Sequence, residues 1–122
     1  MKVDYLKAGS DDCPLIRLYD FSIADAQWLQ AIFETLASGS VESTLLEEIE
    51  SVDGTQLTLM RSSDDQGVIE RSLNRFDIAL TPVGWKQAAE FTEPFCKGTF
   101  GFQWLTPQTH GIQLLLSKTG GW

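Results

Sequence analysis

The sequence predicts an α+β fold in which two helices cover one face of a mainly antiparallel sheet of about six strands, forming two layers. Two helical patterns each begin at a hydroxyl residue and end at a glycine. The first runs from Ser22 to Gly39 and the second from Thr81 to Gly98. Both intervals are 17 residues (39 − 22 and 98 − 81). Each helical pattern follows a strand-like run and precedes a strand-like pair. The predicted order is β-α-β-β-β-α-β-β, so a duplicated β-α-β-β plan is a hypothesis for this chain.

The first strand and helix have clear local signals. Residues 15–21 form an apolar run after a proline, which favours a strand. Ser22 is a good helix N-cap, and Asp25 stands where the acid of a capping box belongs. One apolar helix face follows at i, i+3, i+4 and i+7, consisting of Leu29, Ile32, Phe33 and Leu36. Gly39 supplies a left-handed stop.

The middle of the chain predicts three strands. Residues 41–50 and 55–62 are expected to pair through a hairpin at Asp53-Gly54, a dipeptide typical of tight turns. A third strand is expected to end at Leu80. Its alternation changes phase around Asn74, which predicts a bulge or a bend there.

The second helix is expected to begin at Thr81, with Pro82 at the first helical position. Pro94 predicts a distorted last turn. Two strands are then expected at residues 100–105 and 112–117.

The length of 122 residues indicates one domain. We expect residues 1–13 to be a loosely held arm and residues 118–122 to be a flexible tail. No apolar run approaches the roughly 20 residues that span a membrane, and the first residues lack the pattern of a secretory signal. A cytoplasmic location is therefore expected, without a membrane partner.

Nine basic and seventeen acidic residues make the net charge −8. This charge would repel a phosphate backbone, so we expect no nucleic-acid partner. A basic protein partner suits the charge better, although acidity also keeps small domains soluble.

Few residues have the spacing that catalysis or metal binding requires. His110 is the one histidine and lies in a predicted turn, and no zinc, phosphate-loop or serine-nucleophile motif is present. Cys13 and Cys96 are the two cysteines; the sequence leaves a disulfide open but favours free thiols. We therefore predict no cofactor, no metal and no catalytic residue, and we favour a protein that is not an enzyme over an enzyme that uses carboxylates alone.

Aromatic residues near the end of the chain are the candidate interaction surface. Phe100, Phe102 and Trp104 share one face of a predicted strand. Three rings on one face favour a place in the core, and the alternative is a surface that binds a partner. With His110 and Trp122 they form the candidate set.

The sequence predicts no single activity. The first hypothesis is a non-catalytic domain that acts through protein–protein contact, with another protein or as a homodimer. The second is a small-molecule binder or carboxylate-based enzyme with a pocket between helices and sheet. The third is an inhibitor or immunity-type protein that uses its acidic surface.

Overall fold

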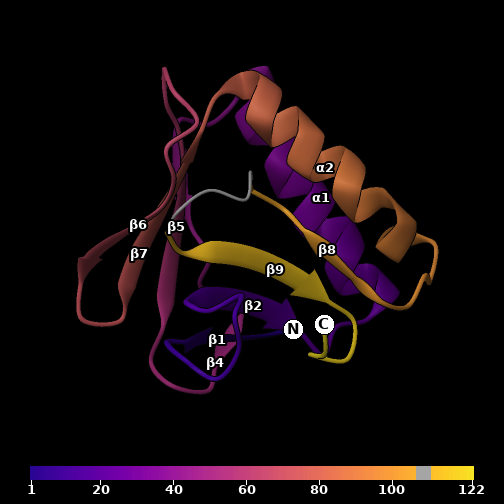
Figure 1. The fold of residues 1–122 in the computed structure, drawn as a ribbon. Coiled ribbons are helices and arrows are strands. Elements are labelled where there is room, and N and C mark those ends of the chain that lie inside the picture. The colour runs from indigo at the N-terminus through magenta and orange to yellow at the C-terminus, as the bar shows by residue number, and fades with distance from the viewer. Residues whose placement is uncertain (107–110) are drawn as a thin grey trace.

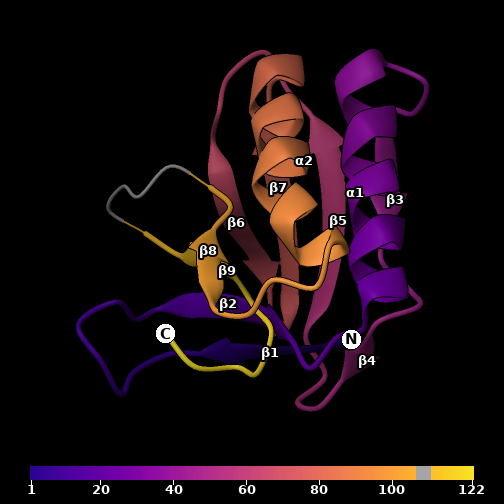
Figure 2. The ribbon, with the colours of Figure 1, turned by 90° about the vertical axis from the view of Figure 1, so that its right-hand side faces the viewer.

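The computed structural model describes residues 1–106 and 111–122, which form two helices and two mixed sheets around one core (Figure 1). The first sheet has the strand order β4-β1-β2-β9-β8, which corresponds to Glu50–Ser51, Lys2–Leu6, Leu15–Tyr19, Gln113–Ser117 and Phe102–Trp104. The second has the order β3-β5-β7-β6, which corresponds to Ser43–Leu45, Gln56–Arg61, Arg75–Leu80 and Gly67–Ser72. Helices α1 (Ile23–Ser38) and α2 (Pro82–Cys96) lie side by side on one face of the second sheet (Figure 2).

The predicted α+β class, with both helices on one side of a sheet, is confirmed. The finer arrangement differs from the expected one. The described residues contain nine strands in two sheets, where about six strands in one sheet were expected. Four strand pairs are antiparallel and three are parallel, so both sheets are mixed.

The predicted helix starts are confirmed by their hydrogen bonds. The Ser22 hydroxyl accepts from the backbone N–H of Asp25, and the Asp25 carboxylate accepts from the N–H of Ser22, which completes a capping box. The Thr81 hydroxyl accepts from the N–H of Gly84. At the end of α1, Gly39 has φ +84°, the left-handed conformation that stops a helix.

The ends of the chain are more ordered than the sequence indicated. The expected arm over residues 1–13 is wrong for Lys2–Leu6, because this segment is β1, which lies between β2 and β4. Val3 anchors it by entering the core. Residues 118–122 fold back onto the first sheet, where the Gly120 carbonyl accepts from Arg17 and the Gly121 carbonyl accepts from the Ser117 hydroxyl.

The segment predicted as one strand over residues 41–50 divides between the two sheets. It contains β3 and β4, and between them Leu46 and Ile49 turn into the core. The Asp53-Gly54 turn therefore joins strands of different sheets, and the predicted tight turn is wrong. The predicted antiparallel pairing of the two segments is confirmed, because β3 pairs with β5. The Asp53 carboxylate instead accepts from the backbone N–H groups of Tyr5 and Thr55, at 2.9 and 3.0 Å, and so ties this turn to β1.

The phase change at Asn74 marks a reversal of the chain. Asn74 has φ +63°, a conformation that asparagine tolerates better than most residues, and the flanking residues form the antiparallel hairpin of β6 and β7. The single bent strand expected here is wrong. A register shift does occur, but it lies between Glu70 and Ser72, within β6.

The two halves of the chain follow one plan, in which a β-hairpin, a helix and a second strand pair succeed one another. The first half is β1-β2-α1-β3-β5 and the second is β6-β7-α2-β8-β9, and each sheet combines the hairpin of one half with the later strand pair of the other. Matching bonds run from Leu46 N to Leu57 O and from Leu105 N to Leu114 O, with donors 59 residues apart (105 − 46). These correspondences support the duplication hypothesis with a unit of β-β-α-β-β. Strand β4 is the addition to the first half.

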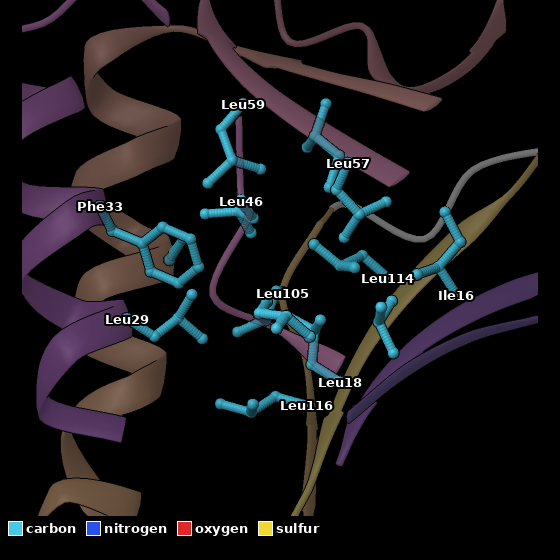
Figure 3. Packing of buried hydrophobic residues seen from close by; sticks show 14 of the residues in the cluster. Ile16, Leu18, Leu29, Phe33, Leu46, Leu57, Leu59, Leu105, Leu114 and Leu116 are labelled. Atoms are coloured by element: carbon cyan, nitrogen blue, oxygen red, sulfur yellow. The ribbon is translucent and has the colours of Figure 1, made fainter. Parts of the chain in front are cut away.

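The core lies where the helices meet the inner faces of both sheets (Figure 3). Leu29 and Phe33 reach it from α1, while the first sheet contributes Leu18 and Leu116 (Figure 3). Trp85 of α2 is fully buried; its ring stacks on Phe33 at 5.4 Å and its indole N–H donates to the Met60 carbonyl at 2.9 Å. The core thus occupies the space in which the sequence predicted a pocket between helices and sheet.

Candidate functional site

Strand β8 is an edge strand whose aromatic side chains project away from the core. Among the described strands it pairs with β9 alone, so that Phe102 lies opposite Ser117 and Trp104 lies opposite Leu115. Opposite residues of an antiparallel pair share a face, and their neighbours Leu114 and Leu116 point into the core. Phe102 and Trp104 therefore lie on the outer face of the first sheet. Within the described part of the chain, β8 forms one edge of this sheet (Figure 2).

Exposure confirms that these rings are not core residues. Phe100 is 73% exposed and Phe102 is 47% exposed, while Trp104 is half-buried. The Phe102 and Trp104 rings meet edge to face, with centroids 6.3 Å apart. Phe91 of α2 adds a fourth ring, 41% exposed. We call Phe91, Phe100, Phe102 and Trp104 the aromatic surface. The sequence pattern favoured a core role for three of them, and that expectation is wrong.

A hollow of about 220 Å³ opens between Trp104 and Phe91. Its remaining apolar lining comes from Leu80, Leu105 and Gly84, and its polar lining comes from Asp65, Gln87 and Thr106. We call this space the Trp104 hollow. It joins the outer face of β8 to the exposed side of α2, so the aromatic surface continues across two elements.

Asp65 holds a fixed position in the Trp104 hollow. Its Oδ1 accepts from the backbone N–H of Thr81 at 2.8 Å and from the Thr81 hydroxyl at 2.9 Å. Gly84 permits this approach, because a Cβ there would lie 2.6 Å from the same oxygen. Asp65 is the one charged residue in the described lining of this hollow. The carboxylate therefore presents a negative charge at a defined place beside the two rings.

Two further residues, Trp122 and His110, belong to the predicted set. The Trp122 indole N–H donates to the Asp12 carboxylate at 3.1 Å, in the loop between β1 and β2. His110 lies outside the described residues. The sequence interpretation missed Phe91 and Asp65. Phe91 could have been found from the sequence, because it is a large apolar residue that lies outside the apolar face predicted for its helix. Asp65 stands in a polar turn, and no sequence pattern indicated a role for it.

A second, larger hollow of about 420 Å³ lies between the two helices. Ala37 and Ala89 contribute its small apolar side chains, while Glu34, Glu90, Glu93 and Lys86 contribute the charges. At this junction the Gln30 amide N–H donates to the Ala89 carbonyl and its oxygen accepts from the Cys96 thiol. Burial raises the pKa of the Cys96 thiol, and the carboxylates of Glu93 and Glu34 raise it further. The thiol is therefore not an activated nucleophile.

The described residues contain no metal-binding cluster, and the two carboxyl groups with a shifted pKa, Asp25 and Asp53, both have it lowered. Within residues 1–106 and 111–122, no three histidine, cysteine or carboxylate side chains are placed to hold a metal ion. The hydrogen bond from the Ser22 backbone lowers the pKa of Asp25. Burial alone would raise the pKa of Asp53, but the hydrogen bonds from Tyr5 and Thr55 lower it overall. Neither carboxyl is adapted to donate a proton near neutral pH. Cys13 and Cys96 are both free thiols.

Neither helix in the described part of the chain has the length and apolar character to cross a membrane. Comparison with protein-family models, with curated proteins and with solved structures found no match.

Proposed function

We propose that this protein is a non-catalytic, cytoplasmic binding domain that acts through protein–protein contact at the aromatic surface. The observation that carries the proposal is the exposure of Phe102 on the edge strand β8 and of Phe100 just before that strand. Exposed rings of this kind lower the solubility of a monomer, and aromatic residues are enriched at the centres of protein interfaces.

The edge of β8 supports the same proposal through its backbone. An extended segment of a partner can add to such an edge as a further strand, with main-chain hydrogen bonds for affinity and side-chain contacts for specificity. The described β8 has only three residues, Phe102–Trp104, so the backbone contribution is small. The rings of the aromatic surface and the Trp104 hollow then supply most of the binding free energy.

The experiment is photo-crosslinking followed by reconstitution. Benzoylphenylalanine is placed at position 102 and, as a matched control, at the exposed position 31 on α1. A protein crosslinked from position 102 alone is purified and its Kd is measured against the wild type and Phe102→Ser. We expect Phe102→Ser to weaken binding at least tenfold, as for an interface hot spot. Equal affinities for the two forms would refute the proposal.

A homodimer formed through the aromatic surface is one version of this function. Light scattering of the purified protein tests it, because a dimer that uses this surface dissociates in Phe100→Ser/Phe102→Ser. If the protein is a monomer at every concentration tested, the partner is a different protein.

A small-molecule binder is the second candidate, favoured by the hollow between the helices. Its volume of about 420 Å³ lies in the range of roughly 300–1,000 Å³ that ligand sites occupy. Replacement of Ala89 by Leu would reduce this hollow. A ligand found by thermal-shift screening that no longer stabilises Ala89→Leu would support this function.

A further inference from the structure

We propose that the Trp104 hollow receives one basic side chain, arginine or lysine, from an extended segment of the protein partner. Its apolar stem would lie between Phe91 and Trp104, and its charged end would meet the Asp65 carboxylate. This inference rests on the proposed function, since it names the partner's chemistry at the same surface.

The size of the hollow favours a side chain over a free ligand. Its volume of about 220 Å³ is below the roughly 300–1,000 Å³ of sites that enclose drug-sized molecules. A hollow beside an edge strand is also where alternate side chains of an added strand would project. A single long side chain from such a segment is the occupant that suits both its volume and its place.

The lining suits a side chain that is apolar along its length and positive at its end. Leu80 and Leu105 are almost completely buried and would pack against methylene groups. The faces of tryptophan and phenylalanine attract a cation within about 6 Å of the ring centroid, with the strongest attraction for tryptophan. Lysine and arginine combine such a stem with such a charge.

The charge at the mouth of the hollow has the matching sign. Asp65 lies at the N-terminus of α2, where the helix dipole contributes roughly half a positive charge. The full negative charge of the carboxylate exceeds it, so this end of the hollow is negative. The net charge of −8 means that the protein as a whole also attracts positively charged segments. A basic segment would be attracted at long range and then oriented by Asp65.

The test uses a displayed library of random 12-residue peptides. Peptides that bind the wild type but not Trp104→Ala are selected, and their Kd values are measured by fluorescence polarisation. We expect the selected peptides to share an arginine or lysine next to apolar residues. Replacement of that arginine by citrulline, which is neutral and of similar shape, should weaken binding at least tenfold. For a lysine, norleucine is the corresponding neutral replacement.

Two protein variants locate the effect at Asp65. Asp65→Asn keeps an oxygen that can accept from Thr81 but removes the charge. This variant should therefore bind the basic peptide and its neutral analogue with nearly the same affinity. Glu90→Gln removes one negative charge from α2 outside this hollow, and should preserve the difference in affinity between the two peptides. The peptide replacement needs only the wild-type protein, so it decides the question even where a variant folds poorly.

The outcomes separate this inference from the proposed function. Peptides that require Trp104 and Phe102 yet bind equally well without the basic residue would overturn the inference and leave the binding surface in place. A library that yields no peptide dependent on Trp104 would overturn the inference, while photo-crosslinking from position 102 tests the proposed function separately.

Discussion

Arg17 of β2 forms a bidentate ion pair with Asp4 of β1, with Nε and Nη2 donating to the two carboxylate oxygens at 2.8 and 2.9 Å. The same guanidinium donates through Nη1 to the Gly120 carbonyl and lies over the Tyr19 ring at 4.1 Å. One side chain thus joins β1 to the folded-back residues 118–122 across the outer face of the first sheet. The hydrogen bonds to Asp4 raise the pKa of Arg17, so the guanidinium is charged at neutral pH.

Replacement of Arg17 by Met should destabilise the protein by about 1–3 kcal/mol, because a buried acceptor is left without its partner. The Asp4 carboxylate is only 7% exposed, and the change would leave it nearly buried without its partner. Urea denaturation measures the loss. Glu93→Gln is the control: it removes an acid from the exposed Lys97–Glu93 pair on α2 and should leave the midpoint unchanged. Equal midpoints for Arg17→Met and the wild type would show that the pair is not stabilising.

Replacement of Phe102 by Ser should leave the stability of the fold almost unchanged, because about half of this ring is already in water. The nearby Phe95 is the matched comparison. It is buried and meets Phe21 edge to face, so Phe95→Ala should cost about 3–5 kcal/mol. Thermal unfolding of both variants gives the comparison. A large loss in Phe102→Ser would mean that the ring supports the fold and would weaken the case for an interface.

The two helix caps should respond differently to removal of the hydroxyl. Ser22→Ala loses the capping bond to Asp25 N and should cost about 1 kcal/mol. Thr81→Ala should cost more, about 1–2 kcal/mol, because Thr81 Oγ1 both caps α2 and donates to the Asp65 carboxylate. Denaturant titration of each variant, with Ser63→Ala in an exposed turn as control, checks the order. The reverse order would contradict the role given to Asp65.

Acid should destabilise the turn at Asp53. The pKa of this carboxyl is lowered in the folded state, so its stabilising effect is full above the unfolded pKa of roughly 3.9 and is lost as the pH falls through the lower, folded value. We expect Asp53→Asn to lose the hydrogen bond from Tyr5, which costs about 0.5–1 kcal/mol at pH 7. Between pH 5 and pH 2 the variant should lose less stability than the wild type, as measured by urea denaturation at each pH. Parallel pH profiles would contradict this account.

Much of the candidate site depended on contacts that a single segment of sequence does not contain. Phe102 and Trp104 were identified as a pair on one face, but alternation alone does not distinguish an inner from an outer face. That distinction came from the pairing of Trp104 with Leu115, whose neighbours in β9 enter the core. Asp65 became part of the site only because the hairpin of β6 and β7 and the start of α2 bring it to Trp104.

The sequence by itself determined the two helices, and it indicated two similar halves although the unit that it predicted, β-α-β-β, lacked the first strand. Caps at Ser22 and Thr81 and the glycine at Gly39 act over a few residues, so their signals lie within the segments that they shape. The tertiary structure alone decided that residues 41–50 divide between two sheets, that Lys2–Leu6 becomes a strand between two others, and that the rings of β8 face outward. These outcomes depend on hydrogen bonds and burial between segments far apart in the chain, and no local pattern specifies which segments will meet.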